Sequence, residues 1–132
     1  MNPHLFVYGT LLSSACHPMG ARLGREARLI GEASIEGRLY SLGRYPGLVD
    51  VVDRESRVHG EVFVLNSPTV SLAWLDAYER ISSNNAHNDY ERCERKVLLM
   101  SGQELTVWVY LYRASVRGLP TVPQGRWSGR HG

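Results

Sequence analysis

The most informative segment of this sequence, close to its N-terminus, is Leu5-Phe6-Val7-Tyr8-Gly9-Thr10-Leu11-Leu12. Its first residues are aliphatic, aromatic or β-branched, as in a buried strand. The strand stops at Gly9, which permits a positive φ angle and lets another group approach the backbone closely. We therefore expect the amides of residues 9–12 to be able to hold a carboxylate or a developing oxyanion. Taken alone, the segment favours the simpler interpretation of a first strand and an ordinary turn.

The length and composition predict a single soluble domain that covers residues 1–132. The chain has 132 residues, of which 43% are hydrophobic, and this is enough to bury a core without disulfides or metals. No apolar run approaches the ~20 residues that a membrane-spanning helix needs. No basic segment followed by a long apolar one marks a secretory signal after Met1. We expect a cytoplasmic protein that does not bind membranes.

The charged, cysteine and histidine residues exclude several classes of function. The net charge is only +2 and the arginines are interleaved with acids, so we expect no binding to nucleic acid. Cys16 and Cys93 form no C-x-x-C motif, and we expect each to be a buried or idle thiol. We expect no metal site either, because paired spacing is missing among His4, His17, His59, His87 and His131.

The pattern along the chain predicts an α+β fold with many short strands and one clear helix. Ser67 and Pro68 are typical of the N-cap and first position of a helix, which should run to residue 80 or 81. Residues 13–28 should form a loop with one helical turn near 18–23, because proline and glycine interrupt the apolar pattern. After the first strand, further strands are expected at residues 28–36, 37–42, 48–52, 58–65, 90–100 and 104–113.

The predicted helix supplies a candidate for chemistry, Glu79. At 100° per residue, Glu79 shares a face with Leu72 and Leu75, whereas Asp76 and Arg80 turn away from Leu75 and Tyr78. A carboxylate beside apolar side chains loses hydration and becomes a better base near neutral pH. The alternative is that Glu79 pairs with Arg80 or Arg92 at the end of the helix, and helix phase alone does not decide between the two.

Several short motifs, in their order and spacing, resemble the γ-glutamylcyclotransferase-like family, which includes γ-glutamylamine cyclotransferases and plant AIG2-like proteins. The resemblance covers nearly the whole chain. The motifs that carry it are Tyr8-Gly9-Thr10-Leu11, Gly37-Arg38-Leu39-Tyr40, Tyr45-Pro46-Gly47, Val58-His59-Gly60-Glu61-Val62-Phe63, Leu75-Asp76-Ala77-Tyr78-Glu79, Tyr90-Glu91-Arg92, Val109-Tyr110 and Gly125-Arg126-Trp127.

The resemblance implies a compact mixed β-barrel with flanking helices. A pocket would lie between the Tyr-Gly-Thr-Leu loop and the helix that ends at the glutamate. By motif position, Glu79 corresponds to the catalytic acid/base. The implied substrate-binding residues are the loop that grips the glutamyl head and two pocket tyrosines: Tyr8, Gly9, Thr10, Leu11, Tyr90 and Tyr110. Family members often have glycine after the glutamate, and Arg80 stands there instead.

The implied reaction is an intramolecular cyclisation of a γ-glutamyl substrate. The substrate's α-amine attacks its own γ-carbonyl, which gives 5-oxoproline and releases an amine or amino acid. The reaction needs no enzyme nucleophile, metal or cofactor, which suits a chain without a G-x-S-x-G motif. Other readings remain open: a γ-glutamylamine cyclotransferase, an enzyme that removes a γ-glutamyl group from a biosynthetic intermediate, or a non-catalytic protein that binds a small molecule or a partner.

Overall fold

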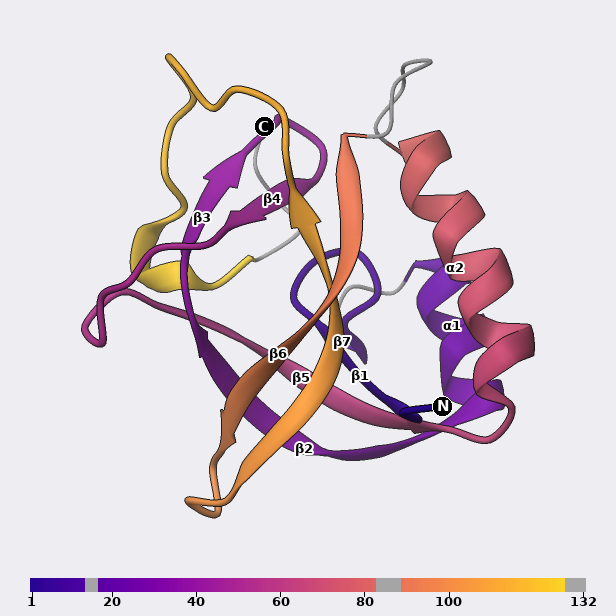
Figure 1. Ribbon diagram of the computed structural model, residues 1–132. Coiled ribbons are helices and arrows are strands. Elements are labelled where there is room, and N and C mark those ends of the chain that lie inside the picture. The colour runs from indigo at the N-terminus through magenta and orange to yellow at the C-terminus, as the bar shows by residue number, and fades with distance from the viewer. Residues whose placement is uncertain (14–16, 83–88, 128–132) are drawn as a thin grey trace.

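The computed structural model describes residues 1–13, 17–82 and 89–127, without the side chains of residues 79–82. Five of its strands close into a barrel (Figure 1). β1 (His4–Val7) is antiparallel to β5 (Arg57–Leu65) and parallel to β7 (Glu104–Tyr112). From β5 the ring continues through β2 (Ala27–Glu36) and β6 (Tyr90–Leu99) to β7. The predicted mixed barrel with flanking helices is therefore confirmed.

The first strand contributes to two separate apolar clusters. Because side chains alternate across a strand, Phe6 and Tyr8 belong to one cluster while Leu5 and Val7 belong to the other. The first cluster also contains buried residues of β5, β6 and β7, among them Val62, Val97 and Val109. The second contains buried residues of both helices, Leu23, Leu72 and Leu75. The apolar N-terminal segment is therefore buried on both faces.

A two-stranded sheet lies beside the barrel and is formed by β3 (Arg38–Ser41) and β4 (Pro46–Val49). The strand expected at residues 48–52 begins earlier and ends earlier than predicted. Its pairing with β3 starts at Pro46, opposite Ser41, and stops at Val49. Past this pairing the chain leaves the sheet, and Val52 is fully exposed.

The C-terminal part of the described chain returns to this sheet. Thr121 forms a β-bridge with Tyr40, and a short helix, η2 (Pro123–Gly125), follows it. After η2 the chain places Trp127 in the same apolar cluster as Phe6. The segment thus contributes a large aromatic side chain to the core of the barrel.

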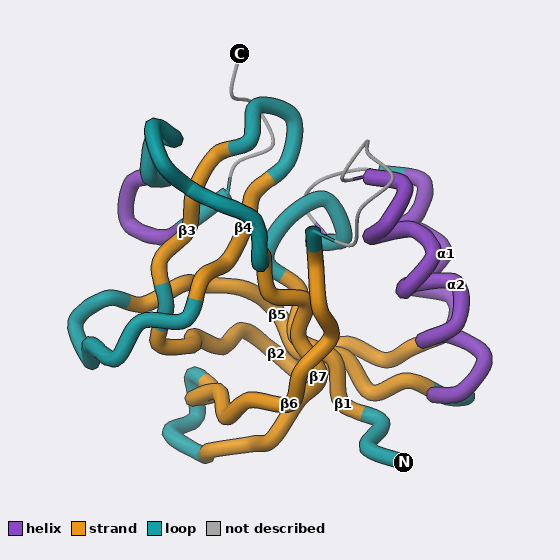
Figure 2. Tube along the Cα trace, turned by 45° about the horizontal axis from the view of Figure 1, so that its top comes forward, coloured by secondary structure: helices purple, strands orange, loops and turns teal. Residues whose placement is uncertain are grey.

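The helices α1 (Pro18–Glu26) and α2 (Pro68–Ser82) lie next to each other on one side of the barrel (Figure 2). Glu26 at the end of α1 accepts hydrogen bonds from Ser71 and Trp74 of α2, at 2.7 Å and 2.8 Å. α2 begins at Pro68, as predicted, and ends one residue past the predicted range. The side of α2 that carries Leu72 and Leu75 is buried.

The prediction for residues 13–28 was wrong, because residues 18–26 form a nine-residue helix rather than a loop with one turn. Its N-cap is His17, whose Nδ1 accepts a hydrogen bond from the amide of Met19. The interrupting Gly20 faces the carbonyl oxygen of Leu11, which a Cβ atom would approach to 3.3 Å. Burial of Leu23 stabilises a helix that local propensity disfavours. Among the described residues, neither helix has the length and apolar character needed to cross a membrane.

Candidate functional site

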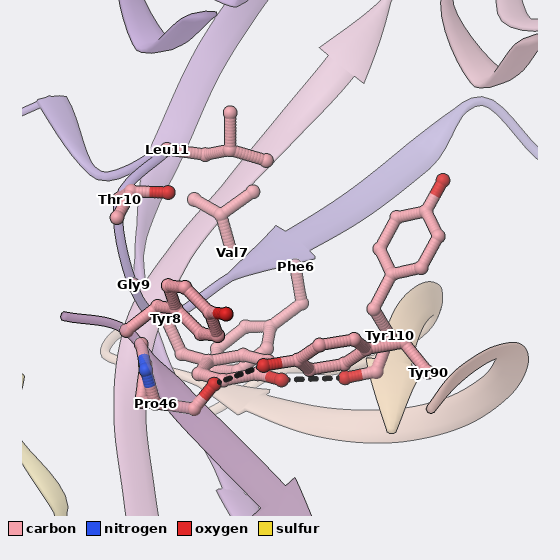
Figure 3. Close-up of a pocket in the computed structure, with 10 residues that line it drawn as sticks. Phe6, Val7, Tyr8, Gly9, Thr10, Leu11, Pro46, Tyr90 and Tyr110 are labelled. Atoms are coloured by element: carbon pink, nitrogen blue, oxygen red, sulfur yellow. Dashed lines mark hydrogen bonds between the residues drawn. The ribbon is translucent and has the colours of Figure 1, made fainter. Parts of the chain in front are cut away.

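A small pocket opens where β1 ends, between the loop after β1 and strands β4, β6 and β7 (Figure 3). All six residues that the sequence predicts for substrate binding line it: Tyr8, Gly9, Thr10, Leu11, Tyr90 and Tyr110. The structure thus brings together residues that are up to about a hundred positions apart in the chain. Their part in substrate binding stays a prediction.

Four further residues line the same pocket and were not singled out as site residues from the sequence: Phe6, Val7, Tyr45 and Pro46. Phe6 and Val7 belong to the strand that leads into the loop, so their position follows from the predicted strand. Tyr45 and Pro46 belong to the Tyr-Pro-Gly motif, and this motif could have identified them as pocket residues. Pro46 of that motif lies next to Gly9 of the loop (Figure 3).

The hydroxyl groups of Tyr8 and Tyr90 bond to the backbone of the pocket wall. Tyr8 donates a 2.7 Å hydrogen bond to the carbonyl oxygen of Tyr110 and accepts a 3.4 Å bond from the amide of Leu48. Tyr90 donates a 2.8 Å bond to the carbonyl oxygen of Pro46. Figure 3 shows these two carbonyl contacts side by side. They tie strands β1, β4, β6 and β7 together and give the pocket a defined shape.

Of the two features expected at Gly9, a positive φ angle and the close approach of another group, the structure shows the second. The φ angle of Gly9 is not among the positive φ angles of the described residues, so the predicted left-handed backbone is wrong. A Cβ atom at this position would lie 2.8 Å from Cγ of Pro46. Since real Cβ contacts of this length do not occur, Gly9 allows the loop to pack directly against Pro46.

The loop after Gly9 is a tight turn. The amide of Leu12 donates a 3.0 Å hydrogen bond to the carbonyl oxygen of Gly9. This corrects the expectation that all the amides of residues 9–12 face a ligand, because the amide of Leu12 is used within the turn. The amides of Gly9, Thr10 and Leu11 remain the candidates for an anion-binding group.

The C-terminal part of α2 reaches this loop. The hydroxyl of Tyr78 shares a hydrogen bond with the hydroxyl of Thr10, and the Tyr78 ring lies 5.7 Å from the ring of His17. The next residue along α2 is the predicted catalytic Glu79. Its backbone is helical, and its side chain lies outside the described residues. The predicted burial of its face is supported at Leu72 and Leu75, which are 2% and 0% exposed.

Asp76 has contacts that the sequence did not reveal. Helix phase turns it away from Leu75 and Tyr78, and in this direction it meets β6 and β7. Its Oδ1 accepts a 2.6 Å hydrogen bond from the hydroxyl of Tyr110, and its two oxygens pair with Nε and Nη2 of Arg92 at 2.9 Å and 3.2 Å. The hydrogen bonds from Arg92 to Asp76 raise the pKa of the guanidinium above its usual value. Arg92, which the alternative named with Arg80 as a partner for Glu79, pairs with Asp76.

The described residues contain no group of three or more His, Cys, Asp or Glu side chains that could hold a metal ion. Cys93 is a partly buried free thiol, and Cys16 lies outside the described residues. The pocket is lined mostly by tyrosine and apolar side chains and by the backbone of the loop after β1. Such a lining can hold a small polar molecule by hydrogen bonds and by contact with aromatic rings.

Comparison with known proteins gives a family for this fold and pocket. The model of the family described as "Gamma-glutamyl cyclotransferase, AIG2-like" matches residues 5–129. The γ-glutamylcyclotransferase family protein YtfP of Escherichia coli K12 is 34% identical over 128 residues, which are 96% of each chain. The chain therefore belongs to the γ-glutamyl cyclotransferase, AIG2-like family, as its motifs predicted.

Solved structures agree with this assignment. The solution structure of YtfP from Escherichia coli has a TM-score of 0.62 and 32% identity, over 94% of this chain and 95% of that one. The crystal structure of an AIG2-like protein from Mus musculus has a TM-score of 0.68 over 98% of this chain and 97% of that one. At 21% identity, the mouse protein shows similarity of fold alone.

Proposed function

We propose that this chain is an enzyme of the γ-glutamyl cyclotransferase type. It would convert a γ-glutamyl compound into 5-oxoproline and a free amine or amino acid. The observation that carries the proposal is the hydrogen bond between Thr10 and Tyr78, which joins the Tyr-Gly-Thr-Leu loop to the residue before Glu79. The contact supports the proposal, because Tyr78 belongs to the part of the helix that leads to Glu79 and Thr10 belongs to a loop whose amides suit an anion. Membership of the family supports the same reaction.

In the proposed reaction, the bonds that form and break all belong to the substrate. The α-amine nitrogen forms a bond to the γ-carbonyl carbon, and the bond between that carbon and the amide nitrogen breaks. One proton leaves the attacking nitrogen and one proton reaches the leaving nitrogen, so no oxidant, reductant or water is consumed. Closing a five-membered ring requires the chain of the substrate to fold back on itself, which a pocket can favour by holding both ends.

We assign the proton transfers to Glu79. As a carboxylate, it would take the proton that the attacking α-amine loses as the ring closes, and it would return that proton to the leaving nitrogen. The amides of Gly9, Thr10 and Leu11 would bind the α-carboxylate and so orient the substrate for ring closure. The rings of Tyr8, Tyr90 and Tyr110 would enclose the aliphatic part of the glutamyl group.

The test is direct detection of 5-oxoproline. The purified chain is incubated with a panel of γ-glutamyl amino acids and γ-glutamyl amines, and 5-oxoproline is measured by mass spectrometry. Matched controls are the same compounds with an acetylated α-amine, which cannot cyclise. We expect 5-oxoproline from at least one unmodified substrate and none from its acetylated form. Ligand-dependent thermal stabilisation without 5-oxoproline from any substrate would replace the proposed enzyme with a binding protein.

A further inference from the structure

Besides the hydrogen bond of Tyr78 to Thr10, the described part of helix α2 has two further polar attachments to the rest of the molecule. Near its start, Ser71 and Trp74 donate to Glu26 of α1. Near its end, Asp76 accepts hydrogen bonds from Tyr110 of β7 and Arg92 of β6. The first attachment holds α2 to α1, and the second holds α2 to the barrel.

The second attachment connects the pocket wall to the helix. Tyr110 lines the pocket, and its hydroxyl donates to Asp76, which lies three residues before Glu79 in the same helix. Arg92 adds two further bonds to Asp76, and its guanidinium stacks 4.5 Å from the centre of the Trp108 ring. Asp76 is therefore fixed from two neighbouring strands.

The exposure of this group indicates that its main contribution is geometric. The side chains of Arg92 and Asp76 are 24% and 38% exposed, and ion pairs that retain this much contact with water contribute little to the free energy of unfolding. The two bonds from Arg92 and the bond from the Tyr110 hydroxyl nevertheless fix the orientation of the Asp76 carboxylate, because the strength of each bond depends on its angle. The expected role of the group is thus to set the position of the helix against the barrel.

We propose that Asp76 is a positioning residue, which holds the last turn of α2, and with it Glu79, at a fixed distance from the pocket wall through Tyr110 and Arg92. This inference rests on the proposed function. Displacement of a catalytic group by about 1 Å can lower a rate by about 100-fold. Loss of Asp76 should therefore reduce kcat by more than it changes KM, because Asp76 does not itself line the pocket.

The experiment compares Asp76→Ala, Asp76→Asn and the matched control Asp50→Ala. Asp50 also pairs with an arginine of β6, Arg95, at 3.0 Å and with similar exposure, but its described partners, Arg95 and Arg113, do not line the pocket. Asparagine retains an oxygen acceptor for the hydroxyl of Tyr110 and should keep much of the activity. Two quantities are measured for each variant: kcat and KM for 5-oxoproline release, and amide hydrogen exchange of residues 79–82.

For Asp76→Ala we expect kcat to fall at least about tenfold, with smaller changes in KM. Exchange at residues 79–82 should be at least about tenfold faster, while the first turn of α2 keeps its native exchange rate. Asp76→Asn should give intermediate values, and Asp50→Ala should match the native chain in both quantities.

Native exchange at residues 79–82 in Asp76→Ala overturns the inference, and so does a native kcat in that variant. If Asp76→Ala does not fold, Asp76→Asn and Tyr110→Phe decide the same question, because each removes part of the group. If the native chain releases no 5-oxoproline, the proposed function fails. The exchange measurement then still decides whether Asp76 holds the last turn of the helix.

Discussion

The hydroxyl groups of Thr10 and Tyr78 share a hydrogen bond that joins the loop after β1 to the end of α2. The two residues are 68 positions apart in the chain. Their contact matters because the loop provides the candidate anion-binding amides, while the helix provides the candidate acid/base. This bond thus connects the loop and the helix of the proposed site.

Replacing Thr10 with valine should remove this bond and keep the shape of the side chain. We expect the free energy of unfolding to fall by only about 1 kcal/mol, the usual net contribution of a hydrogen bond. The value of kcat/KM should fall more, by about tenfold, because the loop and the helix lose their alignment. Thr10→Ser retains the hydroxyl and serves as the control. Equal kcat/KM values for the valine and serine variants would contradict this role.

Replacing Gly9 with alanine should destabilise the fold. Because the new Cβ atom would lie 2.8 Å from Pro46, the loop or β4 must shift. The expected cost is about 1–3 kcal/mol, measured by urea denaturation. Gly24→Ala is the control, since nothing lies within 4 Å of a Cβ atom there. A helix-interior alanine should stabilise by about 0.5–1 kcal/mol. If both variants unfold at the same urea concentration, Pro46 does not constrain Gly9.

The acid stability of the protein should depend on Glu26. Hydrogen bonds from Trp74 and Ser71, followed by the contact with Arg22, lower the pKa of Glu26 from 4.5 to about 2. Because the pKa is lower in the folded state, the stabilisation is present above pH 4.5 and is lost as the pH falls toward 2. The melting temperature of the native chain should therefore decrease more steeply over this range than that of Glu26→Gln. Parallel curves for the two proteins would show that the carboxylate is not stabilised by folding.

Much of the fold could be predicted from local patterns. Alternating apolar residues define β5, and Ser67 with Pro68 marks the start of α2, as the structure confirms. The extent of α1 could not be predicted, because its stability depends on packing of Leu23 against other elements. Its glycines, which lower helix propensity, hide the helix from a local pattern.

The lining of the pocket was predictable from the motifs, and the contacts of its residues were less so. The Tyr-Gly-Thr-Leu motif located the loop, and the structure places its residues in one pocket with Tyr90 and Tyr110. The contact between Gly9 and Pro46 requires knowledge of where β4 packs. Likewise, the role of Asp76 depends on Tyr110 and Arg92, which reach it only when the barrel closes. Contacts of this kind have no local signal in the sequence.

The central proposal is that Glu79 transfers protons during the formation of 5-oxoproline. The most direct measurement is the rate of 5-oxoproline release by the native chain and by Glu79→Gln, with circular dichroism to establish that both are folded. The amide is nearly isosteric but cannot act as the base, so we expect the rate to fall by at least about 100-fold. A folded Glu79→Gln variant that releases 5-oxoproline at the native rate would contradict the proposal.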